Sequence, residues 1–97
     1  MKSVLITYDQ AHQDNVMDAL DASNVRGYTI LEQAGGRGTK TGVPHLGSHA
    51  WPSMNSAIIT MVEDAQVTPL LNRLHQLDID NPLLGLRAFV WNIEQCI

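Results

Sequence analysis

The sequence is poor in several residue types, and each shortage excludes a class of protein. It has a single cysteine, Cys96, so no disulfide can form within the chain. Its apolar runs are only a few residues long, which predicts no insertion into a membrane. Aromatic residues make up 5% and charged residues 16% of the chain, but apolar residues reach 44%, which is enough for one core. We therefore expect one domain over residues 1–97, in a soluble protein of the cytoplasm.

Acidic residues are missing from residues 33–62, although the chain has ten Asp and Glu and a net charge of -4. By formal count this segment carries +2 and the rest of the chain -6, and it contains five of the seven glycines. The acidic balance argues against nucleic acid as a partner. The acid-free segment itself is suited to hold one small anion.

Hydrophobic patterning predicts four strands and two helices in the order βαββαβ. Asp9 is expected to cap the first helix and Glu63-Asp64 the second, with Pro69 in the first turn of the second helix. The acidic stretch 78–82 is expected to be a connector. The predicted strands are residues 2–8, 28–33, 55–62 and 85–93, and the first helix is residues 10–23.

This order predicts an α+β, ferredoxin-like sandwich with both helices on one face of an antiparallel sheet. The other face then carries some of the apolar residues Ile58, Ile59, Phe89 and Trp91. An exposed apolar sheet face needs a partner, and a second copy of the chain is the simplest one. Residues 34–53, between the second and third strands, form a long loop of the kind that is usually functional.

The chain resembles the nitrogen-regulatory PII superfamily, which includes PII-like signalling proteins and the cation-tolerance protein CutA. The resemblance in topology covers nearly the whole chain, and the resemblance in residues covers about thirty positions. These positions run from Gly27 to Ala57, and the motifs within them are Gly27-Tyr28-Thr29, Gly35-Gly36-Arg37-Gly38, His45-Leu46-Gly47-Ser48-His49, Trp51-Pro52 and Asn55-Ser56-Ala57.

The resemblance implies a homotrimer with a ligand site in each cleft between subunits. It also implies that loop 34–53 corresponds to the T-loop and contacts a target protein. The classical ATP site is not recognisable, because the turn before the last strand, residues 78–82, is acidic and has no glycine. No Arg pair follows the last strand, and neither Tyr8 nor Tyr28 lies on the loop.

A small ligand is predicted to bind near the start of the loop. Glycines let backbone N–H groups converge on an anion, and neighbouring cations add charge. The alternative is a flexible hairpin loop with two solvated cations. Asn55, where the third strand begins, is interpreted either as a cap or as a ligand contact. The candidate ligand-binding residues are Gly35, Gly36, Arg37, Gly38, Lys40 and Asn55.

Two histidines and one tryptophan complete the candidate residues. His45 and His49 are possible ligands of a divalent metal, although a structural zinc site needs four ligands. They alternatively fix the shape of the loop through hydrogen bonds. Trp51 either anchors the returning end of the loop or contacts the partner protein.

We expect a regulatory protein, not an enzyme, since the loop has no acid that could orient a histidine as a base. The leading hypothesis is a PII-like signalling trimer whose cofactor is a small anion, a nucleotide or a divalent metal. The alternative is a CutA-like metal-binding or metal-tolerance protein that uses His45 and His49.

Overall fold

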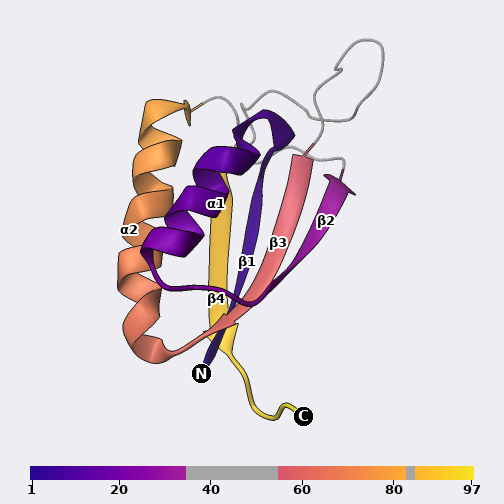
Figure 1. Cartoon of the computed structure of the whole chain (residues 1–97), viewed down its shortest axis with the longest axis vertical. Helices are drawn as coiled ribbons and strands as arrows, with labels where there is room; N and C mark the ends of the chain where they lie inside the picture. Colours follow the sequence, from indigo (N-terminus) through magenta and orange to yellow (C-terminus); the bar gives the residue numbers. More distant parts are fainter. Residues whose placement is uncertain (35–54, 83–84) are drawn as a thin grey trace.

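The computed structural model describes residues 1–34, 55–82 and 85–97 and shows a four-stranded antiparallel sheet with two helices on one face (Figure 1). A short 3-10 helix, η1 (Gln10–His12), leads into α1 (Gln13–Ala22), and α2 (Asp64–Asp80) follows β3. The sheet order β2-β3-β1-β4 confirms the predicted ferredoxin-like fold. The strands are β1 (Lys2–Asp9), β2 (Tyr28–Ala34), β3 (Asn55–Val62) and β4 (Arg87–Asn92).

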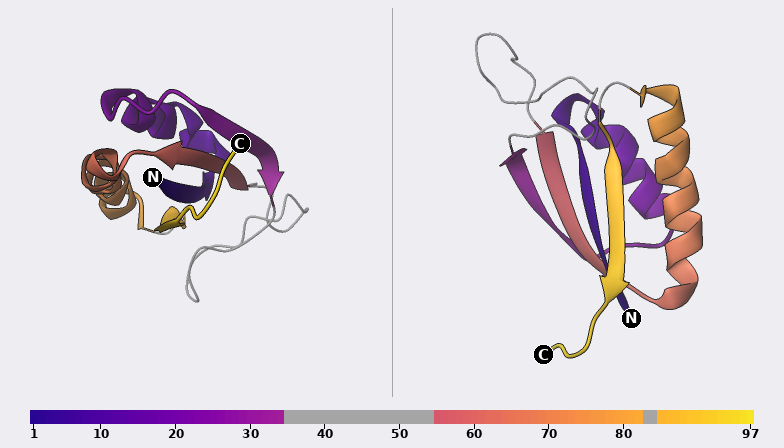
Figure 2. Two further views of the ribbon diagram at one scale, coloured as in Figure 1. Left: turned by 90° about the horizontal axis from the view of Figure 1, so that it is seen from below. Right: turned by 180° about the vertical axis from the view of Figure 1, so that it is seen from behind.

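The core lies between the sheet and the helix layer, which Figure 2 shows from below and from behind. In β1 every second side chain points into this core, as the alternation in the sequence predicted. Both helices contribute residues at intervals of three and four, which places them on one face of each helix. The core residues of the sheet, α1 and α2 that are 0% exposed are Val4, Ile6, Tyr8, Val16, Leu20, Ile58 and Leu70.

Neither α1 nor α2 covers the opposite face of the sheet, which is largely apolar among the described residues. Leu5 of β1 pairs with Ile59 of β3 on one side and with Phe89 of β4 on the other, so all three lie on this face. Ile58 points into the core instead. We call this surface the open face; its exposed apolar side chains are Leu31, Met61, Phe89 and Trp91.

Local hydrogen bonds fix where the helices begin and end. The Asp9 carboxylate accepts a hydrogen bond from the backbone N–H of Ala11 at 2.8 Å and so caps η1, whereas α1 begins after His12. At the start of α2, the backbone N–H of Glu63 donates to the Gln66 side chain at 2.8 Å. Asn24 adopts a left-handed φ of 60° after α1, a conformation that Asn tolerates better than most residues.

Two predictions about the second helix are wrong. Pro69 lies in the second turn of α2, not in the first, because the helix begins at Asp64. Burial of Leu70 and Leu74 against the sheet holds the helix together despite the missing N–H of Pro69. The helix also continues through Asp80, so Asp78 and Asp80 lie in its last turn and not in a connector.

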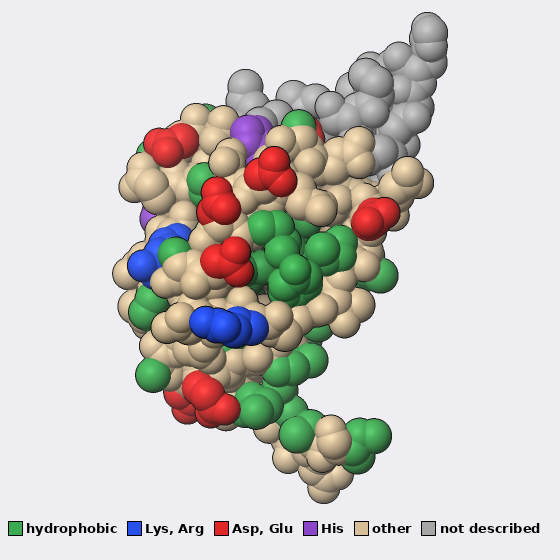
Figure 3. All heavy atoms as spheres, viewed as in Figure 1, with side chains coloured by type: hydrophobic (Ala, Val, Ile, Leu, Met, Phe, Trp, Pro, Cys, Tyr) green, Lys and Arg blue, Asp and Glu red, His purple; other side chains and the backbone are tan. Residues whose placement is uncertain are grey.

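The surface over the helices is acidic. Asp and Glu side chains are spread across the helix-covered face in Figure 3. The two helices carry six aspartates, which are Asp14, Asp18 and Asp21 in α1 and Asp64, Asp78 and Asp80 in α2. Within the described ranges, no helix is long and apolar enough to cross a membrane.

Candidate functional site

Both undescribed segments join the described chain at one end of the sheet. Residues 35–54 connect Ala34 to Asn55, and these two residues are themselves register partners between β2 and β3. Asn55 also pairs with Asp9, the last residue of β1, and Thr7 pairs with Arg87, the first residue of β4. We call this the loop end of the sheet, and it is uppermost in Figure 1. Any site built by the predicted loop therefore borders these residues.

Asn55 is the predicted ligand-binding residue that the structure describes. It is the first residue of β3, as expected, and is 5% exposed, opposite the equally buried Asp9. Its place at the loop end is compatible with a ligand contact, which stays a prediction. The other candidate residues lie outside the described residues: Gly35, Gly36, Arg37, Gly38, Lys40, His45, His49 and Trp51.

A buried tyrosine lies just inside the loop end. The Tyr8 hydroxyl donates a hydrogen bond to the Gln13 side chain at 3.2 Å. Burial raises the pKa of Tyr8 above its ordinary value, and a hydrogen bond with Ser56 offsets part of that rise. Tyr8 therefore stays neutral near pH 7 and ties β1 to α1. Its fully buried phenol serves the fold and is not placed to touch a ligand.

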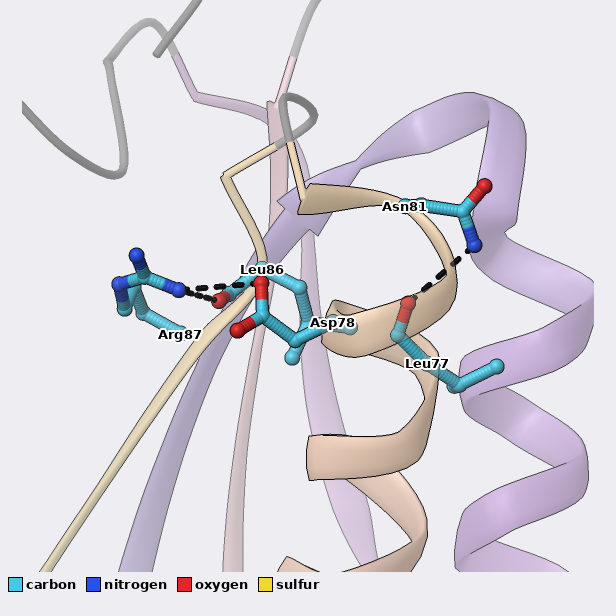
Figure 4. Close-up of polar contacts among 5 residues, drawn as sticks. All are labelled: Leu77, Asp78, Asn81, Leu86 and Arg87. Carbon is cyan, nitrogen blue, oxygen red and sulfur yellow. Dashed lines mark hydrogen bonds and ion pairs between the residues drawn. The ribbon is translucent and has the colours of Figure 1, made fainter. Parts of the chain in front are cut away.

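Arg87 brings a cation to the loop end, and the sequence interpretation missed it. The guanidinium Nη1 lies 3.1 Å from Oδ1 of Asp78 and donates to the backbone carbonyl of Leu86 at 2.6 Å (Figure 4). Among the described Lys and Arg residues, it is the one at this end of the molecule. The feature of the sequence that could have indicated Arg87 is its position as a basic residue at the start of the last strand, where an anion can approach the end of the sheet.

A groove of about 360 Å³ runs between α2 and β4 beside this ion pair. Its apolar lining includes Leu71, Leu74 and Leu86, and its charged lining includes Asp78 and Arg87. This combination of an apolar lining with a few charged groups is typical of small-molecule sites. A second cavity, beside Tyr8 and Asn81, measures only about 10 Å³ and is too small for a nucleotide.

The ion pair changes the electrostatic argument made from the sequence. The acidic residues Asp78 and Asp80 were one reason why the classical ATP site was not recognisable in the sequence. The Asp78 carboxylate instead faces Arg87, and Asp80 accepts a hydrogen bond from the Gln76 side chain at 3.1 Å. The charges at this corner are therefore partly balanced, and an anion is less disfavoured than the sequence indicated.

The metal-binding hypothesis finds no support from the described part of the chain. There, no group of three or more His, Cys, Asp and Glu side chains comes close enough together to hold a metal ion. His12 lies 3.4 Å from the Asn15 side chain at its Nδ1 atom, and His75 is exposed on α2. His45 and His49 lie outside the described ranges, so their role as ligands stays a prediction.

Comparison with known proteins agrees with this geometry. The family model of nitrogen regulatory protein P-II matches residues 1–97, the whole chain. No curated protein sequence matches the chain at a significant level. The family match and the ferredoxin-like sheet together identify the chain as a regulatory protein of the PII type. The chain is a member of the nitrogen regulatory protein P-II family.

Solved structures of PII-like proteins superimpose on the chain. CPII from Thiomonas intermedia K12, bound to ADP, AMP and bicarbonate, has 26% identity and a TM-score of 0.77 over 95% of this chain and 84% of its own. CPII bound to ADP and bicarbonate has 27% identity and a TM-score of 0.76 over the same shares. A protein from Thermus thermophilus, described as PII-like, has 23% identity and a TM-score of 0.66 over 95% of this chain and 85% of its own, which supports the fold alone.

Proposed function

We propose that the protein is a PII-like regulator that binds an adenine nucleotide or a small anion such as bicarbonate at the loop end. The observation that carries the proposal is the likeness, over 95% of the chain, to CPII bound to ADP, AMP and bicarbonate. Arg87 supports it, because a guanidinium matches the geometry of phosphate and of carboxylate-like anions. The groove beside Arg87 supplies apolar surface that a base could contact.

The working form is proposed to be a homotrimer, with ligand sites between neighbouring copies. The open face supports this because Phe89 and Trp91 are 54% and 49% exposed in the single chain. Exposed apolar surface of this kind marks an interaction site. A shallow hollow of about 470 Å³ on this face, lined in part by Ser3, Met61 and Trp91, offers a place for a neighbouring copy.

Signalling is proposed to pass through loop 34–53. In this scheme Gly35, Gly36, Arg37, Gly38 and Lys40 contact the ligand together with Asn55, and Trp51 contacts a target protein. Binding of a ligand near the ends of the loop then changes the surface offered to the target. The protein acts by binding and not by catalysis, and its proposed location is the cytoplasm.

Calorimetric titration tests the ligand proposal directly. ADP, AMP and bicarbonate are titrated separately into the wild-type oligomer and into two variants, R87Q and R26Q. Wild type is expected to bind at least one of the three, and R87Q is expected to bind it about tenfold or more weakly, because a charge-assisted contact is lost. Arg26 is exposed and immediately precedes Gly27 and β2, away from the loop end, so R26Q is the matched loss of charge and should bind like wild type.

A titration with zinc tests the alternative function, which is metal binding. Failure of the wild-type oligomer to bind ADP, AMP or bicarbonate would overturn the proposal. Zinc binding in that same protein, lost in a His45→Ala/His49→Ala double variant, would then favour the metal-binding function.

A further inference from the structure

The contact between Asp78 and Arg87 has a geometry that matters for any anion at the loop end. Arg87 is the first residue of β4 and Asp78 lies in the last turn of α2, so two separate elements meet in this ion pair. Both contacts of the guanidinium with described residues, to Asp78 and to the Leu86 carbonyl, use Nη1. In Figure 4 the other guanidinium nitrogens point away from Asp78. These nitrogens have no hydrogen-bond partner among the residues that the structure describes, so a ligand can approach them from that side.

The position of Asp78 is not explained by the stability of its helix. A carboxylate in the last turn of a helix faces the negative end of the helix dipole, which is unfavourable. The last turn of α2 contains no basic residue that would compensate. Among the described residues, Asp78 forms an ion pair with Arg87 at 3.1 Å, and both residues line the groove of about 360 Å³.

We propose that Asp78 competes with the ligand for Arg87 and thereby sets the affinity of the anion site. In the free protein the carboxylate holds the guanidinium against the start of β4. An incoming phosphate or bicarbonate must share Arg87 with Asp78 or displace it. This inference rests on the proposed function, since it assumes that the ligand anion contacts Arg87.

The exposure of the pair indicates how strong the competition is. The Arg87 and Asp78 side chains are 33% and 24% exposed, so water screens their attraction. Ion pairs of this kind are weak, whereas a phosphate can engage a guanidinium through two parallel hydrogen bonds. The carboxylate therefore weakens ligand binding without preventing it, and its removal is expected to raise affinity about three- to tenfold.

The test is calorimetric titration of wild type, D78N and D80N with ADP, AMP and bicarbonate. Asn replaces the Asp78 carboxylate with a neutral group of the same shape. Asp80 is the matched control, because it lies in the same helical turn and its carboxylate accepts from Gln76 and not from Arg87. The inference predicts a lower Kd for D78N, by about three- to tenfold, and an unchanged Kd for D80N.

The possible outcomes separate this inference from the proposed function. If wild type binds and R87Q does not, but D78N binds no more tightly than wild type, the competition is refuted and the proposed function stands. An equal gain in D78N and D80N would also refute it, because general charge would then explain the effect. If none of the proteins binds any of the three ligands, the proposed function and the inference fail together. Circular dichroism confirms that each variant is folded, and Asp78→Ser is a second variant if D78N is unstable.

Discussion

Leu5 and Phe89 lie opposite each other across the β1–β4 pair, on the open face, which neither α1 nor α2 covers. Phe89 is 54% exposed in the single chain, although a phenylalanine ring gains most from burial. Leu5 also pairs in register with Ile59 on its other side, so the apolar surface spans three strands. The face is therefore where association between copies is expected.

Introducing a charge at Phe89 should dissociate the oligomer. Burying the Glu side chain of F89E between copies would cost more than the contact returns, so the variant is expected at the mass of one chain. The measurement is gel filtration with light scattering at matched concentration. I79E is the control, because Ile79 is 55% exposed but lies on α2, away from the open face. A wild-type mass for F89E, or a monomeric wild type, would contradict assembly through this face.

Replacing Pro69 should stabilise the fold. Pro69 is exposed in the second turn of α2, where it cannot donate to the carbonyl four residues earlier. P69A restores that hydrogen bond and is expected to raise the free energy of unfolding by about 1 to 3 kcal/mol, measured by urea denaturation. The neighbouring variant T68A, also at an exposed position, changes only helix propensity and should gain about 0.5 kcal/mol or less. Equal gains in both variants would show that Pro69 carries no special cost.

The buried phenol of Tyr8 should make stability depend on alkaline pH. Burial raises the pKa of Tyr8 in the folded protein above its value in the unfolded chain. The neutral phenol then contributes stability that is fully present below about pH 10 and is lost as the pH rises through the higher folded value.

Urea denaturation between about pH 8 and pH 11 measures this effect. Wild type is expected to lose more stability over this range than Y8F, which has no phenol to ionise. Y8F also lacks the hydrogen bond to Gln13, which lowers its stability at every pH but does not change the slope. Parallel pH profiles for the two proteins would contradict the assignment.

The sequence predicted best those elements in which apolar residues recur at a regular spacing. The strand over residues 55–62 has the predicted bounds, because its apolar residues alternate along its whole length. Residues 78–82 were misassigned as a connector, because two aspartates and a proline read as a break. In the structure Leu77 packs against the core, and the backbone N–H of Asn81 donates to its carbonyl at 3.1 Å, so the helix continues to Asp80.

Arg87 shows why the site was harder to predict than the fold. The cations that the sequence predicted at the site, Arg37 and Lys40, lie inside loop 34–53. Asp78 and Arg87 are nine residues apart, and their contact depends on how α2 lies against β4. No local spacing rule encodes that distance, because it depends on how α2 and β4 pack into the core that contains both Leu74 and Leu86. The contact between Asp78 and Arg87 is therefore a property of the tertiary structure.

The single cysteine offers a practical route to these measurements. Cys96 is exposed and follows β4, whose last residue, Asn92, pairs with Lys2 at the end of the sheet opposite Arg87. A thiol-reactive dye would therefore attach at one defined position per chain, away from the proposed anion site. Energy transfer between dyes on neighbouring copies would then report assembly, while titrations at the other end proceed undisturbed.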